Sequence, residues 1–184
     1  MPRSPGQRAG LTHDAVLDAA HGVLTERGLA GLSMRAVAGR LGVAPNALYS
    51  HVAGKDELVD ALLDDILREL ELPDPHSDPR RGLTDLMTAT HELLLDRVDL
   101  VPLYLARQGA RGPNARALGA AMEGLLARAR VADPGAAVRV LIVHAIGSAA
   151  FAGGPAGDSI GPVPVELRTS FATGLGWLLG GMGV

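Results

Sequence analysis

Cysteine is absent from this chain of 184 residues, and aromatic side chains make up only 3% of it. Without cysteine there is no disulfide framework, no thiol nucleophile and no thiolate metal site. The scarcity of rings argues against a surface that stacks single-stranded nucleic acid. Long blocks of like charge are also missing, and 47% of the residues are hydrophobic. We therefore expect a folded chain rather than a disordered one.

No apolar run is long enough to cross a bilayer. The longest uncharged stretch, residues 140–157, contains Pro155 and adjacent glycines, so we expect a buried helix there. At the N-terminus, Arg3 and Arg8 are followed by the polar residues 12–14, where a secretory signal would have an apolar segment. These features predict a cytoplasmic protein with no membrane span.

Charge is unevenly distributed along the chain. Residues 1–55 hold six basic and three acidic side chains, whereas residues 56–184 hold 11 basic and 17 acidic ones. A basic first segment on an acidic remainder suggests that only the first segment meets a polyanion.

Helical periodicity runs through nearly the whole sequence, and there is no alternating strand pattern of useful length. Thr12, Ser33 and Asp133 are suited to cap helices, and Gly28 and Gly42 to end them. The predicted helices, about nine, run from Thr12 to Gly28 and over 33–41, 45–51, 54–70, 81–97, 100–108, 113–130, 134–151 and 165–181. The expected fold class is all-α.

Two segments rich in proline or glycine interrupt the helices. Pro73–Pro79 reads as a linker, and 153–164 reads as a loop. We expect a three-helix domain at 1–55, a connecting helix at 56–72 and a larger helical domain at 80–184.

The two short helices at 33–41 and 45–51, joined by a turn at Gly42, have the spacing of a helix-turn-helix. A generic three-helix packing without a ligand fits the same spacing. Within the run from 11 to 63, the sequence reads ERGL at 26–29, LSMR at 32–35, LGV at 41–43 and LYSHV at 48–52. These motifs closely resemble the DNA-binding domain of the tetracycline-repressor (TetR) family. The resemblance is specific over 11–68 and looser over 80–152.

The second short helix of the motif is expected to enter the major groove of double-stranded DNA. On its exposed side, Asn46 can pair with adenine and Ala47 can contact a thymine methyl group. Tyr49 is alternatively a half-buried core residue, and His51 either clamps the backbone or packs inside. The arginines of the N-terminal arm, Arg3 and Arg8, either add DNA contacts or belong to a tail that makes none. The predicted DNA-binding residues are Ser33, Arg35, Pro45, Asn46, Ala47, Tyr49, Ser50, His51 and Lys55.

The last two predicted helices are apolar nearly all round and rich in small residues, so they must be buried on several sides. The family resemblance implies that they form a dimer interface, for which Phe171 and Trp177 are the candidate anchors. An ordinary intramolecular core is the alternative.

Several side chains with polar ends lie on otherwise apolar faces of the predicted helices between residues 81 and 151. They suggest a pocket for a neutral or weakly polar small molecule. The candidate ligand-binding residues are Met87, His91, Tyr104, Met122, His144 and Ser148, each of which also suits a satisfied core position. The sequence gives no support for an enzyme. His144 and Ser148 lie one helical turn apart, but no carboxylate in the same helix can orient the histidine. The residue spacings typical of metal ligands are also absent. No cofactor is expected.

Together these features predict a homodimeric transcriptional repressor that binds a near-palindromic DNA operator and releases it on binding a small apolar effector. A DNA-binding regulator without a ligand remains an alternative. So does an accessory protein, or a helical enzyme, that carries a vestigial helix-turn-helix.

Overall fold

A computed structural model describes residues 11–153 and 164–184. The predicted arm residues Arg3 and Arg8, and most of the predicted loop 153–164, lie outside the described residues. All regular structure in the described part is helical, which confirms the all-α prediction. Within it, no helix is both long and apolar enough to span a membrane.

The chain divides into two compact units, Met1–Leu62 and Leu63–Val184. The boundary falls within α3 (Lys55–Ile66), so this helix contributes residues to both units. The predicted connecting segment, 56–72, contains this boundary.

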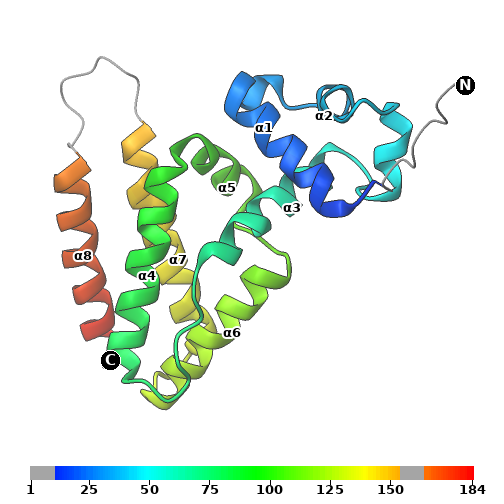
Figure 1. Ribbon diagram of the computed structural model, residues 1–184. Helices are drawn as coiled ribbons and strands as arrows, with labels where there is room; N and C mark the ends of the chain where they lie inside the picture. Colours follow the sequence, from blue (N-terminus) through cyan, green and yellow to red (C-terminus); the bar gives the residue numbers. More distant parts are fainter. Residues whose placement is uncertain (1–10, 154–163) are drawn as a thin grey trace, which may run out of the picture. The chain divides into compact units, whose positions relative to one another are not determined.

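The first unit holds α1 (His13–Gly31), α2 (Met34–Leu41), the 3-10 helix η1 (Pro45–Ser50) and the first two turns of α3 (Figure 1). Thr12 caps α1 as predicted, since its Oγ1 accepts a hydrogen bond of 3.1 Å from the Ala15 amide. The helical conformation of α1 is interrupted at the predicted end, Gly28, where φ is +64°. The core of this unit consists of fully buried aliphatic side chains: Val16, Ala20, Val37, Leu48, Leu58 and Leu62.

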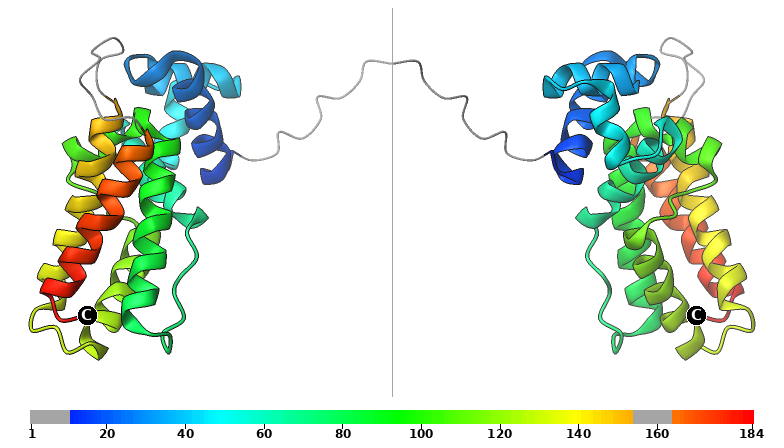
Figure 2. Two further views of the ribbon diagram at one scale, coloured as in Figure 1. Left: turned by 90° about the vertical axis from the view of Figure 1, so that its left-hand side faces the viewer. Right: turned by 90° about the vertical axis from the view of Figure 1, so that its right-hand side faces the viewer.

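Beyond the end of α3, the second unit contains five α-helices: α4 (Pro79–Asp96), α5 (Val101–Arg107), α6 (Pro113–Arg128), α7 (Pro134–Ala150) and α8 (Pro164–Gly181). Short 3-10 helices lie at η2 (Leu67–Glu69), η3 (Val98–Leu100) and η4 (Phe151–Gly153). Figure 2 shows α4, α7 and α8 running alongside one another. Because α7 packs against α4, α5, α6 and α8, it lies at the centre of this unit.

Two predicted helices differ in kind from those observed. The segment predicted at 45–51 is a 3-10 helix, in which the amides of Ala47 and His51 bond to carbonyls three residues back. The helix predicted at 54–70 is α-helical only to Ile66 and then tightens into η2. Hydrogen bonds between residues three apart satisfy the carbonyls at the end of a helix. The spacing of apolar residues predicts a helix but does not show where it changes to this tighter form.

Candidate nucleic-acid interface and effector pocket

The turn between α2 and η1 is fixed by local chemistry. Ser33 Oγ accepts a hydrogen bond of 3.2 Å from the Ala36 amide and so starts α2. Gly42 ends the helix in the left-handed conformation, at φ +66°, which glycine adopts without steric cost. The Val43 amide then bonds to the Ala38 carbonyl at 3.0 Å, and Pro45 opens η1. The two predicted short helices are therefore adjacent and joined by a tight turn.

One residue anchors η1 and leaves the rest of it exposed. Leu48 is fully buried, whereas Tyr49 is 54% exposed, so Tyr49 is not a core aromatic. His51 is half-buried. All the other predicted DNA-binding residues are exposed: Ser33, Arg35, Pro45, Asn46, Ala47, Ser50 and Lys55. The Ser50 hydroxyl donates its proton to the Ala47 carbonyl at 2.9 Å, so its oxygen is left to accept a bond.

Basic side chains lie beside this surface. Arg27 and Arg35 line one shallow depression between α1 and α2 together with Ser33. Arg40 lines it too, but its guanidinium is held by Glu26 at 2.6 Å. Sequence reasoning did not single out Arg27. Its place in the family motif ERGL was the available signal, since cations beside a recognition element favour phosphate contact.

A largely apolar pocket lies in the second unit. It encloses about 700 Å³ out to its mouth and is lined by side chains that include Leu67, Leu86, Met87, Leu118, Met122 and Ile146. No described residue that lines it carries a charge. The predicted pocket residues Met87, Tyr104 and Met122 are all in its wall.

Tyr104 joins this pocket to the last turn of α3. Its hydroxyl donates a hydrogen bond of 2.6 Å to the Leu63 carbonyl. Burial, with a smaller contribution from the charge of Asp64, raises the pKa of Tyr104 well above its usual value. The hydroxyl therefore keeps its proton, and that proton is engaged by the backbone.

His91, His144 and Ser148 do not line this pocket, so their role in ligand binding stays a prediction. His91 Nε2 lies 3.0 Å from Ser148 Oγ, and His144 Nε2 lies 3.0 Å from the Phe171 carbonyl oxygen. They form a separate cluster where α4, α7 and α8 meet. Since α7 is apolar nearly all round, its periodicity does not show which face meets which neighbour.

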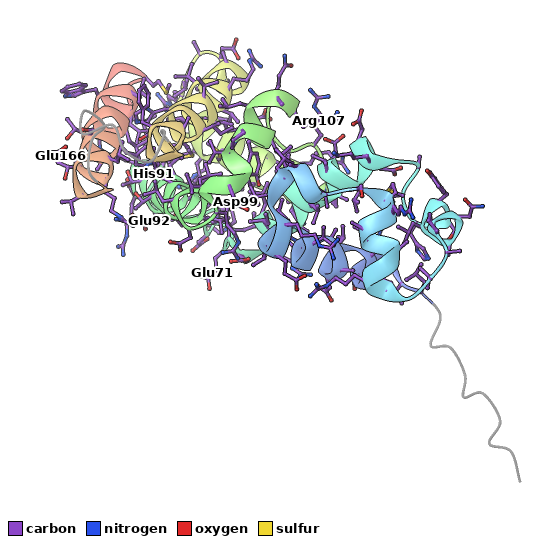
Figure 3. The ribbon with its side chains drawn as sticks, turned by 90° about the horizontal axis from the view of Figure 1, so that it is seen from above. Glu71, His91, Glu92, Asp99, Arg107 and Glu166 are labelled. Atoms are coloured by element: carbon purple, nitrogen blue, oxygen red, sulfur yellow. The ribbon has the colours of Figure 1, made fainter. Side chains whose placement is uncertain are left out.

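Phe171 lies at the centre of this cluster. Its ring is stacked between His91, with ring centroids 4.0 Å apart, and His144, at 4.8 Å. The side chain is only 2% exposed, because its ring is buried within its own subunit. This corrects the prediction that Phe171 anchors a dimer, since almost none of its surface is left for a partner to contact. Beside Phe171 lies Glu92 of α4, which is labelled next to His91 in Figure 3. Glu92 accepts bonds of 2.7–2.9 Å from Arg168 of α8.

The surroundings of His91 favour its neutral form. Burial lowers its pKa, and the nearby His144 and Arg168 lower it further, while Glu92 acts in the opposite direction. The Arg168 partner in turn lowers the pKa of Glu92.

Trp177, the other predicted anchor, is 77% exposed on α8. On α7, Val143 is 68% exposed and Val140 is also exposed, while Phe151 is exposed at the end of that helix. Large apolar side chains are therefore open to solvent on both helices that the sequence assigns to a dimer. We call Val140, Val143, Phe151 and Trp177 the α7/α8 apolar face.

Sequence reasoning missed Asp64, a buried carboxylate in the last turn of α3. Its oxygens accept bonds from the amides of Asn114 and Ala115 at 3.1 and 2.9 Å, and from the Asn114 side chain at 3.1 Å. Gly112 allows this approach, because a Cβ there would lie 2.2 Å from the Asp64 carboxyl carbon. The sequence offered one indication of this contact. The N-cap of α6 is Gly112, which has no side chain to cap the helix, so the first amides of α6 need an acceptor from elsewhere.

Comparison with known proteins agrees with this arrangement. Residues 16–62 match the family described as bacterial regulatory proteins, tetR family. The HTH-type transcriptional repressor DrrR1 of Streptomyces coeruleorubidus is 46% identical over 70 residues, 38% of this chain and 26% of the relative. An HTH-type transcriptional regulator of Saccharopolyspora erythraea is 35% identical over 143 residues, 74% of this chain and 60% of the relative. The chain thus spans less than two thirds of the length of either relative.

Solved structures share the fold over nearly the whole chain. BioQ in complex with its double-stranded DNA operator has a TM-score of 0.73 at 28% identity, covering 94% of this chain and 98% of that chain. A TetR variant from Acinetobacter baumannii AYE in complex with minocycline has a TM-score of 0.79 at 25% identity, covering 93% and 96%. The helix-turn-helix segment of this chain thus belongs to the tetR family of bacterial regulatory proteins, and the fold is shared with these solved structures over more than nine tenths of the chain.

Proposed function

We propose that this protein is a homodimeric transcriptional repressor that binds a near-palindromic operator and releases it when a small apolar molecule occupies the pocket. The observation that carries the proposal is the exposed η1 surface, which is presented by a capped α2 and a single buried anchor, Leu48. The named relatives are transcriptional regulators, which supports the same role. Such a regulator acts in the cytoplasm, where its DNA is.

In this proposal the residues of the first unit divide into readers and clamps. Asn46 and Ala47 reach base edges in the major groove, because they are exposed on the early part of η1. Arg35, Tyr49 and Lys55 contact the phosphate backbone and set the register, with Ser33 and His51 beside them. The depression that holds Arg27 and Arg35 adds positive charge to the same surface.

A dimer follows from the size of the reading element. A single short helix reads only a few base pairs, so useful affinity requires two half-sites and two subunits. The α7/α8 apolar face is the surface that we assign to the partner subunit, since large exposed apolar patches favour association.

Effector sensing is assigned to the pocket and the last turn of α3. Tyr104, a wall residue, binds Leu63, while the N-terminus of α6 binds Asp64. Ala115, which bonds to Asp64, also lines the pocket. A ligand that shifts these groups alters how the end of α3 is held, and this helix begins in the DNA-binding unit. The ligand acts only through its different affinities for the two states.

The test is selection of bound sequences from a random double-stranded DNA library with the full chain, followed by fluorescence anisotropy on the selected site. We expect a site with two inverted half-sites and a dimer bound to it. Compounds that bind the pocket should weaken operator affinity by about 5- to 150-fold. No enrichment of any DNA sequence would contradict the proposal. Operator binding unaffected by every pocket ligand would leave only the DNA-binding part of it.

A further inference from the structure

Gln108 occupies a backbone conformation that favours glycine. Its φ is +57°, and the only other non-glycine residue with positive φ in the described part of the chain is Arg130, at +62°. Both follow the end of a helix and are held in the same way. After Gln108, the Gly109 amide donates a hydrogen bond of 2.8 Å to the Tyr104 carbonyl. After Arg130, the Val131 amide donates one of 3.0 Å to the Leu126 carbonyl. Glycine is the usual residue at such a position, so each side chain is kept there at a cost in stability.

Of these two residues, only Gln108 lines the pocket. The strain does not distinguish these two residues, since Arg130 shares it; the position of Gln108 in the pocket wall does. Arg130 lies on the surface after α6, away from the residues of the pocket wall, and so serves as an internal reference.

The polar side chains of the pocket wall are Thr90, Tyr104 and Gln108. Thr90 donates its hydroxyl proton to the Leu86 carbonyl at 2.8 Å, and Tyr104 donates its own to the Leu63 carbonyl. Each hydroxyl has a single proton, so neither has one left for a ligand. Gln108 is exposed to solvent, and among the side chains of the described wall its amide is the one that has protons left to donate to a bound molecule.

We propose that Gln108 determines the specificity of this pocket, which takes an uncharged, largely apolar molecule with its carbonyl group bound by the Gln108 amide. The inference rests on the proposed role of the pocket as the effector site. A carbonyl elsewhere in the pocket would meet no side-chain donor and would lose its bonds to water. A carboxylate or ammonium group would meet no counter-charge among the described wall residues.

The test uses two uncharged probes of one shape, 2-acetonaphthone and 2-ethylnaphthalene, which differ by a carbonyl in place of a methylene. Sodium 2-naphthoate supplies the charged analogue. Each compound displaces the neutral dye N-phenyl-1-naphthylamine from the full-length protein, and the displacement gives its affinity. The variants are Gln108→Gly and, as the matched control, Arg130→Gly.

We expect Gln108→Gly to weaken 2-acetonaphthone by about 2- to 10-fold relative to 2-ethylnaphthalene, the range of one neutral hydrogen bond. Arg130→Gly should leave this ratio unchanged. Both variants should unfold at a higher urea concentration than the parent, because both relieve a left-handed residue. In the parent protein, 2-naphthoate should bind at least 10-fold more weakly than the ketone.

An unchanged ratio in Gln108→Gly, naphthoate binding as tight as ketone binding, or failure of all three compounds to displace the dye would overturn the inference. Operator binding by the free protein is measured separately. If the ratio shifts as expected but no DNA is bound, the proposed function fails and the ligand class stands. If DNA is bound but Gln108→Gly leaves the ratio of ketone to hydrocarbon affinity unchanged, the proposed function stands and the ligand class fails.

Discussion

At the scale of single residues, two buried polar groups carry constraints that apolar neighbours do not. Asp64 is 4% exposed, yet it is fully engaged by the start of α6. His91 is 1% exposed and bonds to Ser148 while stacking on Phe171. Each is a polar group whose partners come from a distant part of the sequence, and each gives a direct test of the packing in the second unit.

Replacing Asp64 by alanine should destabilise the protein by about 1–3 kcal/mol, because the Asn114 and Ala115 amides then lose their acceptor. Urea unfolding followed by circular dichroism measures the change. Asp85→Ala is the control: its carboxylate is exposed and lies 3.6 Å from Arg81, so its loss should change stability by less than about 0.5 kcal/mol. Equal effects of the two substitutions would show that Asp64 does not cap α6.

Acidification should destabilise the protein through His91. Its pKa is lowered in the folded state, so the unfolded chain takes up the proton more readily. The stability is complete above the ordinary histidine pKa of about 6.5 and falls as the pH drops below it. The urea midpoint should therefore be lower at pH 5.5 than at pH 7.5, and His91→Gln should reduce that difference. An identical pH dependence in the variant would assign the effect to other groups.

At the scale of elements, η1 shows how a short segment can present side chains without burying them. It has one buried residue, Leu48, and its shape depends on the Gly42 turn before it and on bonds between residues three apart. Six residues offer too few backbone bonds to be stable alone, so α1 and α2 must hold this element. Its outward side chains are therefore free to serve recognition.

Reading by η1 and clamping by the start of α3 can be separated by two substitutions. Asn46→Ala should cost about 1–3 kcal/mol on the preferred operator and relax preference at one position of each half-site. Lys55→Ala should weaken all DNA sequences alike and reduce the dependence of affinity on salt. Fluorescence anisotropy on a panel of single-base operator variants at two salt concentrations measures both. A loss of preference in Lys55→Ala alone would reverse the two roles.

At the scale of the whole molecule, α7 serves both the interior and a proposed partner. One part of its surface contributes Ile142 and Ile146 to the pocket wall, and another leaves Val140 and Val143 in solvent. If the proposed effector site and the proposed subunit contact share this helix, they are physically connected, because a packed helix moves as a unit.

Placing a charge on the α7/α8 apolar face should break the proposed dimer. We expect Val143→Glu to sediment as a monomer at micromolar concentration and to lose operator affinity, since a buried unpaired carboxylate is costly. Leu105→Glu is the matched control, because Leu105 is also an exposed aliphatic residue, 53% exposed, but lies on α5. Analytical ultracentrifugation distinguishes the two. A Val143→Glu variant that remains dimeric would place the interface elsewhere.

The sequence by itself determined the features that depend on neighbouring residues. Helix starts at Thr12, Ser33 and Asp133 and the turn at Gly42 follow from local hydrogen bonds and backbone freedom, and the structure confirms them. The helix-turn-helix is built from these local signals, which is why both it and the all-α fold could be predicted.

Only the tertiary structure decided which side chains line the pocket, which pack between helices and which cap a distant helix. Met122 reaches the pocket while His144 meets Phe171, and Asp64 caps a helix about fifty residues away. An apolar helix such as α7 can pack through any of its faces, so its periodicity leaves the choice open. That choice is made by the summed packing of α4, α5, α6 and α8 around it, which no local pattern encodes.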